Sequence, residues 1–294
     1  MKVNYSIRDL EHLSGIKAHT IRMWEQRYGI LSPNRSSTNI RSYSDEDLKA
    51  LLNIAVLNRQ GVRISQIAGM SPGEIEANVE QAAIVEGVPE GQVDAMVLSM
   101  IDLDEDRFEK IVSTSTLRIG FEDTMRHVIF PFLNRIGVMW QTGSITPAHE
   151  HFVTCLIRQK LIVAIDAQYA KPSEETKTLM LYLPEGEWHE IGLLFWHYAL
   201  KRRGHRVIYL GASVPFADLV SVGKVRHFDW LCMIGTTQPS VADLEGYLHR
   251  LGDAFPGRNL AVSGARFRDF HGRMPTGIRL LDGEESMMAF IESV

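Results

Sequence analysis

Apolar and polar residues follow three different patterns along the chain. Residues 1–70 contain short helical stretches separated by glycines, and residues 93–172 repeat apolar positions at helical spacing throughout. Residues 173–294 alternate apolar runs of strand length with amphipathic helices. Residues 71–92 interrupt the pattern. We therefore predict a multidomain protein with α and α/β domains.

The segment 71–92 is predicted to be a linker. Ser71-Pro72-Gly73 and Gly87-Val88-Pro89 break the apolar spacing and leave room for one short helix, from Glu74 to Glu86. A long uninterrupted helix suited to dimerisation is not predicted at this point. Oligomerisation is therefore expected to depend on residues further along the chain.

The first segment is predicted to be a winged helix-turn-helix. Ser6-Ile7-Arg8-Asp9-Leu10 opens a helix that ends at Ser14-Gly15, and a second helix runs from Ala18 to Gly29. The run Asn34 to Tyr43 is polar, basic and of hairpin length, and Ser44-Asp45-Glu46-Asp47 caps a third helix.

Charge is distributed unevenly along the chain. The 294 residues carry a net charge of −5. Residues 1–70 hold ten Lys/Arg and six Asp/Glu, which leaves 21 and 30 for the remainder, so the balance is +4 in the first segment and −9 beyond it. Only the first segment therefore suits a polyanion such as DNA.

The first segment also resembles a known DNA-binding family. Tyr5-Ser6-Ile7, Leu13 to Ile16, Thr20 to Gly29 and Arg41-Ser42-Tyr43 track the DNA-binding domain of MerR regulators, and the match continues to Ile67. The resemblance implies contacts with base edges and phosphates from the start of the second helix, through His19, Thr20 and Arg22. It implies backbone contacts from helix and wing through Arg27, Arg35, Arg41 and Tyr43. Trp24, on one helix face with Tyr28, is predicted to be core rather than a base contact.

The middle segment, residues 93–172, is predicted to be a four-helix bundle. Its helices are expected at the stripe Val93-Met96-Val97-Met100, at Arg107 to Gly120, at Thr124 to Trp140 and at Pro147 to Tyr169. Thr146-Pro147 is a good start signal, with threonine as N-cap and proline at the first helical position.

The last segment, residues 173–294, is predicted to be a flavodoxin-like (Rossmann-type) domain with a five-stranded parallel sheet in the order 2-1-3-4-5. The strands are expected at Thr178 to Leu183, His205 to Leu210, Trp230 to Ile234, Leu260 to Ser263 and Ile278 to Leu281. Parallel sheets of this kind bind ligands at the carboxyl ends of their strands.

His189 lies in the loop that follows the first of these strands. The apolar run ends at Pro184, and a helix is expected from Ile191 to Arg203. A single loop histidine is more often solvated or structural than a ligand. However, Glu187-x-His189-x-x-Gly192 resembles the E/D-x-H-x-x-G signature of cobalamin-binding domains. The resemblance implies that His189 is the lower cobalt ligand, while the carboxylate fixes its tautomer and the glycine lets the helix approach the corrin.

A second motif lies in the bundle. Trp140, nine further residues and Glu150-His151 resemble the Trp-x9-Glu-His motif of light-sensing, adenosylcobalamin-dependent MerR regulators of the CarH and LitR type. The resemblance implies that Trp140 covers the adenosyl group, that Glu150 accepts its ribose hydroxyls and that His151 reaches cobalt once the group departs. Alternatively, Trp140 is core and His149 to His151 form a solvated first turn.

The last domain departs from the cobalamin-binding pattern at two loops. Such domains commonly have Ser-x-Leu after the third strand and Gly-Gly after the fourth, where the nucleotide tail of the cofactor enters. This chain has Gly235-Thr236-Thr237-Gln238 and Ser263-Gly264 instead. Thr236 or Thr237 could supply the hydroxyl, whereas Ser263 narrows the slot. Leu210-Gly211-Ala212-Ser213-Val214-Pro215 again resembles the family, which has Leu-Gly-x-x-x-Pro after the second strand.

Composition limits the remaining possibilities. No apolar run reaches the length of a membrane span or forms a signal peptide, so a cytoplasmic protein is expected. Cys155 and Cys232 lie in apolar runs without a C-x-x-C partner, and both are predicted to be buried.

The predicted function is that of a non-enzymatic transcriptional regulator, and the resemblance implies that it is a repressor. It is expected to bind a double-stranded DNA operator, to form a homo-oligomer (dimer or tetramer) and to sense adenosylcobalamin and light. Two alternatives stay open. The cobalamin-like domain could bind no cofactor and serve oligomerisation or protein docking. The bundle and α/β domain could be the cobalamin module of a methyltransferase, although the length leaves no room for a substrate barrel.

Overall fold

The computed structural model describes residues 5–35, 39–85, 89–141, 145–169, 173–268, 270, 272 and 274–294. By its internal contacts the chain divides into two compact units, residues 1–155 and 156–294. Each unit is described by itself. Within the described residues, no helix combines the length and the apolar character needed to cross a membrane.

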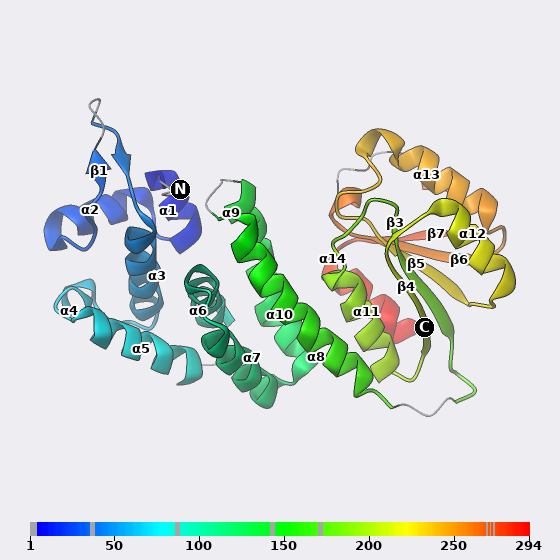
Figure 1. Cartoon of the computed structure of the whole chain (residues 1–294), viewed down its shortest axis with the longest axis horizontal. Coiled ribbons are helices and arrows are strands. Elements are labelled where there is room, and N and C mark those ends of the chain that lie inside the picture. Colours follow the sequence, from blue (N-terminus) through cyan, green and yellow to red (C-terminus); the bar gives the residue numbers. More distant parts are fainter. Residues whose placement is uncertain are drawn as a thin grey trace. The chain divides into compact units, whose positions relative to one another are not determined.

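The first unit begins with the predicted winged helix-turn-helix (Figure 1). Its elements are α1 (Ile7–Ser14), α2 (Ala18–Tyr28), the hairpin strands β1 (Asn34–Arg35) and β2 (Arg41–Ser42), α3 (Asp45–Arg59) and α4 (Ile64–Ile67). Ser6 and Asp9 form a capping box on α1, and Ser44 and Asp47 form one on α3. Gly15 ends α1 in the left-handed conformation. The predicted elements are therefore confirmed, and the wing tip at 36–38 lies outside the described residues.

The segment predicted as a linker is mostly helical. α5 (Pro72–Val85) packs against α3, and α6 (Pro89–Asp102) starts the bundle. Pro72 and Pro89 are each the first residue of a helix. Proline fits this position because the first amide of a helix has no intrahelical partner. Pro72 therefore marks the start of a helix, and α5 corresponds to the short helix expected from Glu74 to Glu86.

The other bundle helices of the first unit are α7 (Glu105–Ile119), α8 (Phe121–Thr124), the π-helical turn η1 (Met125–Ile129), α9 (Phe130–Gln141) and the first part of α10 (Pro147–Asp166). Among them, α7, η1 and α9 contact α6. The predicted third helix, Thr124 to Trp140, thus contains a π-helical turn. Val93, Met96 and Leu98 on α6 are all buried, so this helix is apolar on more than one face.

One buried-residue prediction on α10 is wrong. Val153, Leu156 and Ile157 are buried, but Cys155 is exposed. The apolar run extends over more than one helical turn, so that part of it must face outward. Cys232, on strand β5 of the second unit, is buried as predicted, and burial raises the pKa of its thiol.

The second unit contains the α/β domain. Its strands are β3 (Thr178–Pro184), β4 (Arg206–Val214), β5 (Trp230–Ile234), β6 (Asn259–Ser263) and β7 (Ile278–Leu281). They form one parallel sheet in the order β4-β3-β5-β6-β7, which is the predicted 2-1-3-4-5 order. The predicted fold class is therefore confirmed.

Helices cover both faces of this sheet (Figure 1). They are α11 (Ile191–Arg202), α12 (Phe216–Val225), α13 (Val241–Ala254) and α14 (Gly283–Ser293), with a 3₁₀ turn η2 (Ala265–Phe267) after β6. α12 and α13 contribute Leu219, Leu244 and Leu248 to one core, while α11 and α14 pack together on the other side. Parallel strands buried on both faces explain the continuous apolar runs of the sequence.

Strand β4 is longer than predicted. It continues through the segment after Leu210 to Val214, with register shifts against β3. Gly211 has φ +83° and Ser213 has φ +53°. This irregular end brings Ser213 to the loop that follows β3, where its Oγ accepts from the Gly186 amide at 3.1 Å and its amide donates to the Glu187 carbonyl at 3.0 Å. The end of β4 therefore fixes the loop that carries His189.

Candidate functional site

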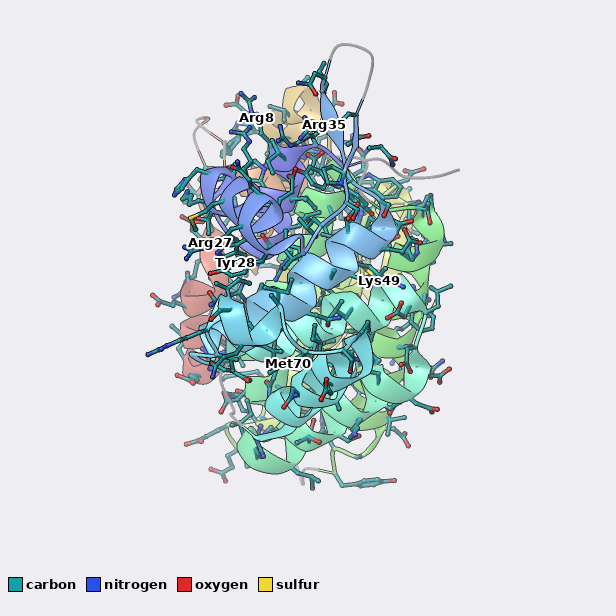
Figure 2. The ribbon with its side chains drawn as sticks, turned by 90° about the vertical axis from the view of Figure 1, so that its left-hand side faces the viewer. Arg8, Arg27, Tyr28, Arg35, Lys49 and Met70 are labelled. Atoms are coloured by element: carbon teal, nitrogen blue, oxygen red, sulfur yellow. The ribbon has the colours of Figure 1, made fainter. Side chains whose placement is uncertain are left out.

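The winged helix exposes several of the predicted DNA contacts. His19, Arg22 and Arg27 are exposed on α2, Thr20 is half-buried, and Arg35 is exposed on β1. Arg8, which sequence reasoning did not select, is exposed on α1. Figure 2 looks onto this part of the first unit and labels Arg8, Arg27 and Arg35. Trp24 is buried, which confirms its assignment to the core.

Glu25 connects α2 to the wing. Its Oε1 lies 3.2 Å from Arg41 Nε and 3.8 Å from Arg35 Nη2, and its Oε2 accepts from the Tyr43 hydroxyl at 3.1 Å. Tyr43 is fully buried, so its placement differs from the predicted contact with the DNA backbone. Its hydroxyl holds the wing on α2 instead. In the sequence, the only indication of this role was that Glu25 is acidic and lies within a basic DNA-binding segment.

Replacing Arg41 by alanine should weaken operator binding and make its salt dependence shallower. A wing arginine facing phosphate releases roughly one counterion, so the slope of log K against log salt should fall by about 0.9. Fluorescence anisotropy of labelled operator at several salt concentrations measures both quantities. Arg118→Ala, at an exposed arginine on α7, is the matched control. Equal slopes for the two variants would remove Arg41 from the backbone contacts.

Trp140 and His151 of the bundle motif are exposed, and Glu150 is half-buried. The side chain of Trp140, at the end of α9, is 50% exposed, which is inconsistent with the alternative that it is core. Glu150 and His151 lie in the first turn of α10, with His151 Nε2 3.5 Å from Glu150 Oε2. His149 has a separate role, because its Nδ1 lies 3.0 Å from Thr146 Oγ1 at the helix start.

The loop after β3 places Glu187 and His189 together in the second unit. Glu187 is fully buried, whereas the His189 side chain is 57% exposed. Glu187 Oε1 lies 2.5 Å from His189 Nδ1, and it accepts the amides of Trp188 at 3.0 Å and His189 at 3.1 Å. A carboxylate at Nδ1 makes this nitrogen the protonated one. Nε2 is then the nitrogen able to bind a metal.

The second carboxylate oxygen of Glu187 binds the loop after β5. Oε2 accepts the amides of Thr236 at 2.9 Å, Thr237 at 2.5 Å and Gln238 at 3.0 Å, together with the Thr237 hydroxyl at 3.2 Å. Burial acts to raise the pKa of Glu187. The hydrogen bonds from His189 and from these backbone amides outweigh it, so the pKa lies well below its ordinary value. The Thr237 hydroxyl therefore contacts Glu187, where the sequence predicted a contact with the cofactor.

The loop after β6 is closely packed against the loop after β5. Ser263 is buried and donates its hydroxyl to the Leu281 carbonyl at 2.8 Å, within the sheet. A Cβ on Gly264, which has φ +114°, would lie 2.3 Å from the Gly235 carbonyl oxygen. A Cβ on Gly235 would lie 3.3 Å from the Phe267 ring. The loops after β5 and β6 are therefore in close contact at Gly235 and Gly264, and the Ser263 hydroxyl is directed into the sheet.

Glu190, the residue after His189, was not selected from the sequence. Its carboxylate binds Arg158 Nε of α10 at 2.8 Å and accepts from the Tyr209 hydroxyl at 3.2 Å. The Tyr209 ring stacks on His197 with centroids 5.2 Å apart. Burial, with a contribution from Lys201, lowers the pKa of His197 to about 4, so this histidine is neutral at physiological pH. The network ties α10 to the start of α11, beside the candidate ligand.

Asp94, on α6 in the first unit, was also not selected from the sequence as a residue with a special role. It is fully buried and pairs with Arg59 of α3 and Arg135 of α9. Arg59 also donates to the Ser14 carbonyl at the end of α1. Burial raises the pKa of Asp94, while the two guanidinium groups act in the opposite direction. An aspartate inside an otherwise apolar helical run was the sequence signal.

Two family models match the chain. Residues 5–74 match the MerR HTH family regulatory protein, and residues 92–164 match the B12 binding domain. The first match covers the winged helix and α4, and the second covers the bundle. Together with the parallel sheet, they define a DNA-binding transcriptional regulator that carries a cobalamin-binding domain.

Curated relatives identify the family. The HTH-type transcriptional repressor CarH of Myxococcus xanthus is 30% identical over 271 residues, 90% of this chain and 90% of that protein. The repressor CarA of Myxococcus xanthus is 32% identical over 220 residues, 72% of this chain and 70% of that protein. The chain belongs to this family of MerR-type transcriptional repressors. The predicted regulatory and non-enzymatic function is therefore confirmed.

Similarity to solved structures is weaker. One match is to the methanol:cobalamin methyltransferase complex MtaBC from Methanosarcina barkeri, with 14% identity and a TM-score of 0.36. It covers 81% of this chain and 92% of the matched chain of that complex. A TM-score this low does not establish a common fold. The assignment therefore depends on the curated relatives and the family models.

The donor chemistry around His189 fits a cobalt ligand. An exposed imidazole, oriented through Nδ1 by a buried carboxylate, is the arrangement in which Nε2 can bind a transition metal. At Gly192 a Cβ would lie 3.3 Å from Ile234 Cδ1, so glycine lets α11 begin close to the sheet. Among the residues that the structure describes, no cluster of three or more His, Cys, Asp and Glu could hold a metal ion by itself.

Proposed function

We propose that this chain is a light-responsive repressor that uses adenosylcobalamin to control its binding to a DNA operator. The observation that carries the proposal is the Glu187 and His189 pair, in which a buried carboxylate orients an exposed imidazole at the carboxyl edge of the sheet. The family membership supports the DNA-binding part. Bound adenosylcobalamin would supply a light-sensitive cobalt–carbon bond.

The roles of individual residues follow from this proposal. His189 holds cobalt through Nε2, while Glu187 keeps Nδ1 protonated and fixes the ring. Gly192 allows α11 to approach the corrin. In the bundle, the exposed indole of Trp140 covers the adenosyl group and Glu150 accepts its ribose hydroxyls. His151 would be the residue available to hold cobalt once the adenosyl group has left.

Repression would follow from a population shift. A cofactor shifts the equilibrium between two conformations of the protein by as much as its affinities for the two conformations differ. In the dark, the loaded protein favours a homo-oligomer whose winged helices bind repeated operator half-sites. Light removes this preference, and the oligomer and its operator complex dissociate.

A titration of the purified chain with adenosylcobalamin in the dark, followed by illumination, tests this proposal. Absorbance measures binding and lower-ligand identity, size-exclusion chromatography measures the oligomer, and a gel-shift assay measures operator binding. We expect a stoichiometric complex that oligomerises and binds operator in the dark and loses both properties after illumination. Operator binding without any cobalamin uptake would favour the alternative, a regulator whose α/β domain serves oligomerisation or protein docking.

A further inference from the structure

Arg266 lies next to the loop that surrounds Glu187. It is in the 3₁₀ turn η2, directly after β6, and its backbone amide donates to the Gly235 carbonyl at 3.0 Å. Its guanidinium Nη2 donates to the Thr237 carbonyl. Arg266 therefore holds the loop after β5 at two positions. Neither the cobalamin signature nor the predicted slot residues include it.

The bond to Thr237 fixes one peptide plane from both sides. The plane between Thr237 and Gln238 contains the Thr237 carbonyl and the Gln238 amide. Arg266 binds the carbonyl, and the amide donates to Glu187 Oε2 at 3.0 Å. Because carbonyl and amide of one peptide point in opposite directions, holding the carbonyl on Arg266 directs the amide at the carboxylate. A charged donor makes this hydrogen bond stronger than one from a neutral group.

The close approach of the two loops makes this contact possible. Gly264 has φ +114°, a conformation that favours glycine, and any Cβ there would overlap the Gly235 carbonyl. The next residues of η2 therefore pass directly beside the loop of residues 235–238. The fold thus determines the backbone position of Arg266.

We propose that Arg266 is a positioning residue for the cobalt ligand. Its guanidinium holds the Gln238 amide against Glu187, and Glu187 in turn fixes the His189 imidazole. The inference rests on the proposed function for the role of His189. The connection from Arg266 to Glu187 is independent of any cofactor.

Substitution of Arg266 tests the proposal in two separate measurements. In the apo protein, hydrogen exchange of the Gln238 amide should become about 10-fold faster or more in Arg266→Gln, since a charged donor no longer orients its peptide plane. Arg268→Gln is the matched control, because Arg268 is an exposed arginine two positions further along. Its exchange rates should equal those of the wild type. Equal rates in both variants would overturn the proposal without reference to cobalamin.

The second measurement uses adenosylcobalamin in the dark. Arg266→Gln should bind it about 10-fold more weakly, which is the usual effect of removing a group that orients a metal ligand. The absorption spectrum should also show that a larger share of the bound cofactor has no nitrogen as its lower ligand. Arg266→Lys should recover most of both, because one charged donor is sufficient for the Thr237 carbonyl. If the wild type binds and Arg266→Gln matches Arg268→Gln, the positioning role is wrong. If the wild type itself does not bind, the proposed function fails, while the exchange measurement still decides the role of Arg266.

Discussion

Replacing Asp94 by asparagine should destabilise the first unit by about 3–5 kcal/mol, the cost of removing one partner from a buried ion pair. Asp94 is fully buried between Arg59 and Arg135. Asparagine keeps the shape but removes the negative charge, so two guanidinium groups would face a neutral side chain. Hydrogen exchange of the α3 and α6 amides measures the free energy of opening in this region.

The matched control for Asp94 is an ion pair between the same two helices. Lys49 of α3 pairs with Asp102 of α6, and both side chains are about one third exposed (36% and 34%). Solvent screens such a pair, so Asp102→Asn should cost less than about 1 kcal/mol. Similar opening free energies for the two variants would contradict a special contribution from the buried cluster. A large difference would show that the winged helix is held on the bundle chiefly through Asp94.

Most elements of the fold could be predicted from the sequence. The strand limits agree within a few residues, and the sheet order follows from the alternation of strands and helices. The short helix expected from Glu74 to Glu86 corresponds to α5. Pro72 was taken as an interruption of the pattern, because a proline has the same local signature whether it ends one helix or begins the next.

The candidate site was predictable where it is local in sequence. Glu187 and His189 are two residues apart, so their pairing needs only a strand end and a short loop. The partners of Glu187 Oε2 lie 49 to 51 residues away. The apolar periodicity of the sequence cannot predict a hydrogen bond between residues so far apart in the chain. The roles of Thr237 and Arg266 therefore emerge only when the parallel strands bring β3, β5 and β6 together.

Side-chain direction was the second limit. Ser263 was expected at the cofactor slot, but its hydroxyl donates to the neighbouring strand β7. Tyr43 was expected on DNA, but its hydroxyl donates to Glu25. In both cases the residue lies where the pattern places it, while its polar atom finds a partner inside the protein. Burying a polar group costs free energy unless the group is hydrogen-bonded. The spacing of residues in the sequence does not show which partner will satisfy this requirement.

Glu187→Gln should affect cobalamin binding more strongly than its place behind the ligand suggests. Loss of a group that orients a metal ligand typically weakens binding about 10–100-fold. In this structure both oxygens of Glu187 accept from several N–H donors. Glutamine would turn an NH₂ group toward one of these sets, so that donors face donors and the loop must move. We therefore expect a loss at or above the upper end of that range, measured by titration in the dark. A loss of cobalamin affinity below about 10-fold, the lower end of that range, would mean that the loop accommodates the glutamine amide.

His189→Ala should abolish cobalamin binding or weaken it beyond detection, together with any cofactor-dependent oligomer. Alanine removes the nitrogen donor, and neither Trp188 nor Glu190 on either side can replace an imidazole on cobalt. Absorbance after incubation with adenosylcobalamin and size-exclusion chromatography in the dark measure the two effects. His227→Ala is the matched control, because His227 is an exposed histidine just before β5, at the opposite edge of the same sheet. It should bind and oligomerise as the wild type does. His151→Ala should load normally in the dark and lose only the stable adduct formed on illumination. Normal spectra and oligomers for His189→Ala would contradict the assignment of the lower ligand and leave the winged helix as the functional part of the chain, with the α/β domain serving another purpose.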